Sequence, residues 1–121
     1  MSYIPDKEAF GVYKLLAQVV PAVANAPEIV FSPNANEEVH ITLASLVNYN
    51  NQDIDFVLYQ DDDGTTYDDS TTIGKGSISR DETGRASAGT IFMNNSTGSV
   101  GVKVSNTNCT ITLWGVVYDL S

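Results

Sequence analysis

The residues with the clearest chemical potential form an acidic stretch near the middle of the chain. Asp61-Asp62-Asp63-Gly64 is followed, after Tyr67, by two further aspartates. Several carboxylates grouped around a glycine turn are the ligands that a hard cation such as Ca²⁺ prefers. The candidates for calcium binding are therefore Asp61, Asp63, Asp68 and Asp69.

The spacing of these carboxylates does not match a calcium-binding EF-hand loop. With Gly64 at the glycine of such a loop, Tyr59 falls at its first position and Ser70 at its last, and neither side chain supplies a carboxylate. A hydrated loop between two strands explains the same residues without a metal. The stretch is therefore predicted to be an exposed loop, with calcium binding as the alternative.

Catalytic arrangements of other kinds are not supported by the sequence. Cys109 would need a base to become a thiolate nucleophile, and the single histidine, His40, is expected on the polar face of its strand while Cys109 points inward. A glycosidase needs two carboxylates, one of them desolvated, but each acid here lies in a polar turn or alternates outward. The sequence predicts no enzyme, no catalytic residue and no cofactor, with Cys109 as a small buried hydrophobe.

The charge balance narrows the choice of partners. The chain has six Lys and Arg residues and 15 Asp and Glu residues, which gives a formal net charge of −9. Binding to DNA or RNA, or to an anionic membrane, depends on clustered cations, whereas these six are scattered along the chain. No apolar run approaches the ~18 residues of a membrane span, and the N-terminus lacks the pattern of a signal peptide. A soluble protein with a basic or mixed-charge protein partner is expected.

Apolar residues alternate at period 2 through most of the chain, which predicts one all-β domain. Strands are expected at 12–20, 28–31, 38–47, 54–59, 72–73 with 77–79, 86–92, 100–104 and 109–121. About eight short antiparallel strands predict a β-sandwich or jelly roll, with 80–85 as a charged turn. In the strand at 38–47, alternation places Ile41 and Leu43 inward and Ala44 outward.

The aromatic residues near the C-terminus are the main candidates for a contact surface. Trp114 alternates opposite to Ile111 and Leu113, so we expect it outside the sandwich core. A second layer or a subunit interface would cover it there, and stacking on a ligand such as a sugar is the alternative.

Residues 1–11 lack the alternation and are expected to form an N-terminal arm ahead of a β-sandwich domain at 12–121. This segment is either a disordered end or an arm whose apolar side chains dock on a neighbouring subunit. The predicted interface residues, from the arm and the last strand, are Tyr3, Ile4, Phe10, Trp114 and Tyr118.

Three short motifs resemble small virion proteins of tailed bacteriophages, especially phages of aquatic bacteria. They are Leu16-Ala17-Gln18-Val19-Val20-Pro21-Ala22, the apolar strand from Ile41 to Asn48, and Leu113-Trp114-Gly115-Val116 close to the terminus. The resemblance covers residues 12–121. Members of this group are similar to jelly-roll or sandwich proteins that decorate assembled capsids, and others are tail or fibre components.

The resemblance implies a capsid decoration (cement) protein that stabilises the head by clamping major capsid proteins without covalent bonds. It further implies a homotrimer located on the capsid surface of the virion after synthesis in the host cytoplasm. The alternative is a receptor- or glycan-binding β module of a tail spike or fibre, using the tyrosine and tryptophan side chains.

Overall fold

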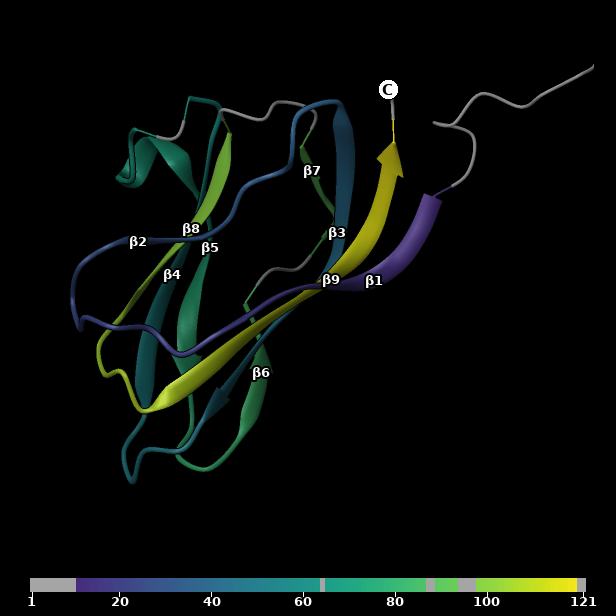
Figure 1. Ribbon diagram of the computed structural model, residues 1–121. Helices are drawn as coiled ribbons and strands as arrows, with labels where there is room; N and C mark the ends of the chain where they lie inside the picture. The colour runs from purple at the N-terminus through teal and green to yellow at the C-terminus, as the bar shows by residue number, and fades with distance from the viewer. Residues whose placement is uncertain (1–10, 64, 87–88, 94–97, 120–121) are drawn as a thin grey trace, which may run out of the picture.

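A computed structural model describes residues 11–119 apart from 64, 87–88 and 94–97, so most of the expected arm, with Tyr3, Ile4 and Phe10, lies outside the described residues. The described chain forms nine β-strands and one short 3-10 turn (Figure 1). The strands are β1 (Gly11–Val19), β2 (Glu28–Phe31), β3 (Glu37–Asn48), β4 (Ile54–Asp61), β5 (Thr72–Ile78), β6 (Thr83–Arg85), β7 (Ile91–Met93), β8 (Ser99–Val104) and β9 (Cys109–Asp119). No helix of the described residues is long and apolar enough to cross a membrane.

The strands form two antiparallel sheets. Sheet A has the order β1-β9-β3-β6, with β7 also paired to β3, and sheet B has the order β2-β8-β4-β5. Successive strands mostly alternate between the two sheets, and the first strand pairs with the last. This is the strand order of a jelly roll, so the predicted all-β sandwich is confirmed.

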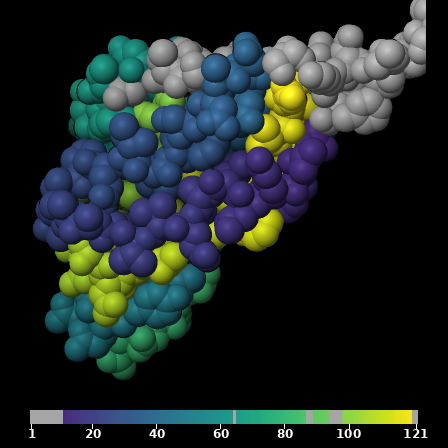
Figure 2. Space-filling model, in the orientation of Figure 1, coloured from purple at the N-terminus to yellow at the C-terminus, as the bar shows by residue number. Residues whose placement is uncertain are grey.

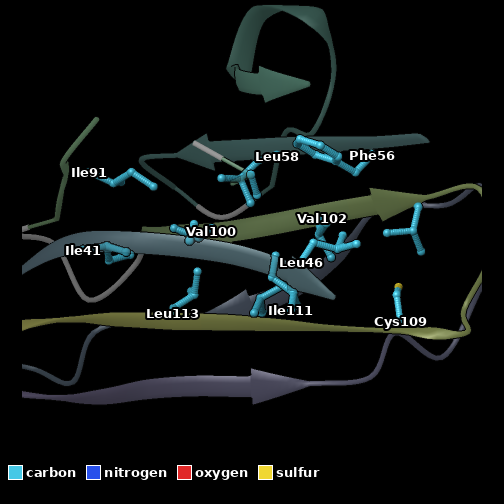
Figure 3. Packing of buried hydrophobic residues seen from close by; sticks show 14 of the residues in the cluster. Ile41, Leu46, Phe56, Leu58, Ile91, Val100, Val102, Cys109, Ile111 and Leu113 are labelled. Carbon is cyan, nitrogen blue, oxygen red and sulfur yellow. The ribbon is translucent and has the colours of Figure 1, made fainter. Parts of the chain in front are cut away.

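The core lies between the two sheets and is built from one alternating set of side chains on each. Figure 3 shows Ile111 and Leu113 of β9 pointing toward Val102 of β8 and Leu58 of β4. These four side chains are fully buried. Each buried side chain of this size contributes roughly 1.5–3 kcal/mol to folding, and the period-2 pattern that predicted the strands is the source of this core.

A fully buried amide connects the ends of the two sheets. Asn48, the last residue of β3, donates from Nδ2 to the carbonyl oxygens of Gln52 and Ile78, each at 2.9 Å, and its Oδ1 accepts from the Asn50 amide at 2.7 Å. Because Ile78 ends β5, these bonds link sheet A to sheet B. The side chain is buried without an unpaired polar atom, which is the condition for a polar residue in a core.

Strands β3 and β9 approach each other unusually closely at Gly115. A Cβ atom added there would lie 2.2 Å from the carbonyl oxygen of His40 and 2.9 Å from the Cα of Ile41. The register between the two strands shifts at the same place, between Ile41 and Leu43, where Thr42 forms a β-bulge. Glycine is required here because the backbone of β3 occupies the space of a side chain.

The bulge overturns one prediction of side-chain direction. The extra residue reverses the alternation of β3, so Ala44 is buried in the core and Leu43 faces outward beside Trp114. A one-residue shift moves each later side chain to the other face.

A second prediction is also wrong, because the expected charged turn at 80–85 ends in strand β6. The pairing of Thr83–Arg85 with Ser45–Val47 of β3 makes this short strand.

Candidate interaction surface

The outer face of sheet A, turned away from the core, carries a group of aromatic and apolar side chains. Directly paired residues of neighbouring strands share a face, and the register pairs Trp114 with Leu15 on one side and Leu43 on the other. The same reasoning extends the group across β1, β9, β3 and β7. We call it the aromatic face, and it consists of Tyr13, Leu15, His40, Leu43, Phe92, Trp114, Val116 and Tyr118.

Ring contacts connect the members of the aromatic face. Tyr13 stacks on Trp114 with ring centroids 5.7 Å apart and planes inclined by 14°. The His40 ring lies 4.6 Å from that of Phe92, edge to face, and 4.9 Å from that of Tyr118. Such pairs contribute roughly 0.5–1.5 kcal/mol each beyond the area they bury. The rings therefore form two groups, and Val116, which is paired with both Tyr13 and His40, lies between them.

The two ends of the aromatic face are open to solvent. Tyr13 is 59% exposed and Phe92 is 62% exposed, while Trp114 and Tyr118 between them are half-buried. One carboxylate belongs to this face in the described strands, Glu38, whose Oε2 lies 2.8 Å from Nε2 of His40. A contiguous group of aromatic and apolar side chains on one face is a candidate contact surface for another molecule.

The aromatic face reaches an open edge of sheet A. Strand β1 is the outermost strand on that side, and Figure 2 shows it in purple at the front with yellow β9 visible on both sides of it. Val12 and Leu15 on β1 are exposed, and Lys14 is its only charged residue. A nine-residue edge strand with a single lysine is weakly protected against pairing with another chain.

The outer face of sheet B differs from that of sheet A because the loop at 61–71 covers part of it. Tyr59 of β4 points outward yet is 2% exposed, with the Tyr67 ring 5.9 Å away, edge to face. The Tyr67 hydroxyl is hydrogen-bonded to that of Ser99, which is also buried. A Cβ added to Gly101 would lie 2.9 Å from the Tyr67 ring, so the glycine leaves room for that ring.

The carboxylates of this loop hold its backbone. Asp61 Oδ2 accepts from the amides of Thr65 and Thr66 at 2.7 and 2.8 Å, and Asp68 caps the 3-10 turn at Asp69–Thr71 by accepting from the Ser70 amide at 2.8 Å. Hydrogen bonds with Asp61 and then Thr65 lower the pKa of Asp63, and those from Ser70 lower the pKa of Asp68. Such bonds favour the ionised form.

Of the calcium candidates, Asp61 and Asp63 lie close together and both accept from the Thr65 amide, but the described part of the loop brings no third candidate to them. Within residues 11–119, leaving aside the gaps, no three His, Cys, Asp or Glu side chains are grouped closely enough to hold a metal ion. Asp61 and Asp68 instead each bond to amides nearby in the sequence. The acidic loop is built as a cover for sheet B.

Cys109 lies in the core and is 1% exposed. Burial raises the pKa of its thiol, and the negative charge of Glu28 raises it further. A neutral, inaccessible thiol is a poor nucleophile. His40 lies on the opposite face of sheet A, so the two residues that sequence reasoning weighed as a pair are separated by the sheet.

Two of the predicted interface residues, Trp114 and Tyr118, lie on the aromatic face. Sequence reasoning missed its other members, of which Tyr13 and Phe92 are the most exposed. Alternation along 11–19 places Tyr13 and Leu15 on one side, a signal that was available. Leu43 was hidden by the bulge, and Phe92 required knowledge that β7 pairs with β3 beside His40.

Comparison with known proteins gives a likeness of fold. No family model matches the chain, and no curated protein matches it. A solved structure, described as "Bacillus endospore appendages form a novel family of disulfide-linked pili", superposes with a TM-score of 0.52 at 11% identity, over 100% of both chains. The pili of that description are disulfide-linked, whereas the single cysteine of this chain is buried.

Proposed function

We propose that this protein is a non-catalytic structural subunit of a larger protein assembly. The observation that carries the proposal is the aromatic face, which presents stacked rings and aliphatic side chains to solvent from four strands. Side chains of this kind are typical of the centre of protein–protein interfaces. The jelly roll supplies a rigid support, and the fold likeness to a protein of bacterial pili gives a precedent for this architecture in an assembly.

In its finer form, the proposal is a capsid decoration protein of a tailed bacteriophage. It rests on the resemblance of the segments at 16–22, 41–48 and 113–116 to small virion proteins. The protein would act as a homotrimer on the capsid surface and clamp neighbouring major capsid proteins. Many copies engaging one shell multiply weak contacts. The charge distribution indicates that a surface other than the aromatic face contacts the capsid. The carboxylates outside the aromatic face suit a basic or mixed-charge capsid surface.

Co-sedimentation of the purified chain with assembled capsids tests this function. We expect saturable binding that weakens as salt rises, because the contact with the capsid is electrostatic in part. Capsids that carry the protein should retain their DNA to a higher temperature than capsids without it. Deleting residues 1–10 should weaken this assembly without unfolding the domain. Absence of saturable binding to capsids would overturn the capsid proposal.

A second candidate function, glycan binding by a tail spike or fibre module, is favoured by one observation. The stacked Tyr13 and Trp114 rings lie on an open side of the molecule, and aromatic rings are platforms for sugars. A glycan array separates the two candidates. Selective binding that is lost in Tyr13→Ala would favour the glycan module, while a decoration protein should show no selective binding.

A further inference from the structure

We infer that the aromatic face is the surface through which copies of this chain associate with one another. The inference rests on the proposed function, an assembly subunit, and names the partner of its main contact surface. Its starting point is that outward-facing rings are covered on one sheet and exposed on the other. Tyr59 on sheet B is covered by Tyr67 of the same chain, whereas no described segment covers Tyr13 or Phe92 on sheet A.

The charge distribution favours a second copy as the partner. A formal net charge of −9 makes two copies repel each other over most of their surfaces. On the aromatic face the single described carboxylate, Glu38, is paired with His40. Two copies that meet through this face therefore each bring one described carboxylate into the contact, and the other described acids stay outside it. A basic partner would instead be drawn to the carboxylates of the loops, such as Asp68 and Glu82.

The shape of the face suits packing against a second sheet. Stacked sheets pack about 10 Å apart through side chains that interdigitate, and the aromatic face spans β1, β9, β3 and β7. Three strand intervals of about 4.8 Å give a width of about 14 Å, and the distance from Trp114 to Tyr118 is about 13 Å. Polar residues of the same sheet face, Gln18, Ser45 and Thr112, extend the surface beyond the rings.

The estimated size of the face indicates a weak association. The apolar centre covers on the order of 200 Å² in projection, well below the roughly 800 Å² per partner of a standard interface. We therefore expect association that depends on protein concentration in the micromolar range. Such contacts become fully occupied where copies are held close together, as on a regular shell.

Sedimentation velocity of the full chain, from about 1 to about 300 µM, tests the inference directly. We expect the wild-type protein to form an oligomer as its concentration rises. Tyr13→Lys and Phe92→Lys, at opposite sides of the face, should each shift the association midpoint about tenfold or more upward. Ile73→Lys on β5, which is exposed on the other sheet, is the matched control and should leave it unchanged. Urea unfolding verifies that each variant is folded.

The single tryptophan reports on the same contact. Trp114 emission should shift to the blue and become protected from acrylamide as the wild-type protein associates, and Phe92→Lys should abolish the change. A wild-type chain that stays monomeric over the whole range overturns the inference, as do equal shifts in face and control variants. A monomer whose Trp114 is protected until residues 1–10 are deleted would assign the cover to that segment and also overturn it. The measurement uses no capsids, so its failure is distinct from failure of the capsid proposal.

Discussion

The outer faces of the two sheets contain similar residues in different surroundings. Each carries tyrosine on an outward-facing position of a strand: Tyr59 on β4 of sheet B and Tyr13 on β1 of sheet A. Tyr59 is 2% exposed because the loop at 61–71 places Tyr67 against it, and Tyr13 is 59% exposed. The chain uses a whole loop to cover one face, and nothing in the described residues covers the other.

This difference indicates which face is complete in a single chain. On sheet B, the Ser70 amide donates to the capping Asp68 carboxylate, and a buried tyrosine–serine contact also holds the cover in place. On sheet A, Tyr13 stacks on Trp114, His40 meets Phe92 edge to face, and the outer surfaces of Tyr13 and Phe92 stay in water. Uncovered apolar surface costs about 25 cal/mol per Å² relative to burial, so a partner that covers the aromatic face gains that free energy.

The largest expected effect is a difference in stability between two glycine substitutions, Gly115→Ala in sheet A and Gly101→Ala in sheet B. Gly115→Ala places a methyl group 2.2 Å from a backbone oxygen of β3, and backbone is unable to move without breaking the β3–β9 pairing. We expect a loss of about 3 kcal/mol or more in the free energy of unfolding. Gly101→Ala meets the Tyr67 ring at 2.9 Å and the backbone oxygen of Glu28 only at 3.1 Å. Because smaller shifts of these neighbours make room for the methyl group, we expect a smaller loss, about 1–2 kcal/mol.

Urea unfolding of the two variants measures this difference, with Gly76→Ala as the matched control. The new methyl group of Gly76→Ala would lie 3.4 Å from the Phe56 ring, which is close to an ordinary contact. We expect that variant to unfold near the wild-type midpoint. Equal losses for Gly115→Ala and Gly76→Ala would show that β3 and β9 are not held as closely as described.

The second largest effect is a difference in stability between Tyr67→Ala, which removes the cover of sheet B, and Tyr13→Ala, on the uncovered face of sheet A. Tyr67→Ala uncovers Tyr59 and removes the bond to Ser99, so we expect a loss of about 2–3 kcal/mol in the free energy of unfolding. Tyr13→Ala removes an exposed ring and should change the unfolding free energy by less than about 1 kcal/mol, while it weakens self-association. Urea unfolding at low protein concentration measures the first pair of values. Equal losses for both variants would remove the distinction between a covered and an uncovered face.

The sequence predicts the sandwich well because period-2 alternation is a local property. Ile111 and Leu113 alternate with Trp114 in one uninterrupted strand, and the structure places them in the core and outside it as expected. The pattern fails where backbone geometry departs from regular pleating. The bulge at Thr42 reversed Leu43 and Ala44, and nothing in the residue types near 42 announces a bulge.

The candidate surface was only partly predictable for a second reason. The members of the aromatic face come from four strands that are distant in sequence, and their meeting depends on the pairing of β1 and β3 with β9. Trp114 and Tyr118 could be chosen from one strand, but Phe92 depends on β7 lying beside His40. In the acidic loop, residue types suggested a site more strongly than the structure does. Its carboxylates suggested a metal, while their described hydrogen bonds are to the loop itself.

The smallest expected effect is a pH dependence confined to the cover of sheet B. Hydrogen bonds in the folded loop lower the pKa of Asp63 and Asp68 below the usual value of about 3.9. A carboxyl whose pKa is lower in the folded state stabilises that state above the unfolded pKa, and the contribution is lost as the pH falls through the folded value. The loop should therefore keep its structure at pH 5 and loosen below about pH 4. NMR titration of the carboxyl carbons of Asp63 and Asp68 should give midpoints below 3.9. The Thr65 and Ser70 amides, which donate to these carboxylates, should respond in the same acid range. Asp68→Asn, which keeps an oxygen acceptor but does not ionise, should remove the pH dependence at Ser70 and leave that at Thr65. Midpoints at or above about 3.9 would mean that these carboxylates do not hold the loop, and the cover of sheet B would then rest on Tyr67 and Ser99 alone.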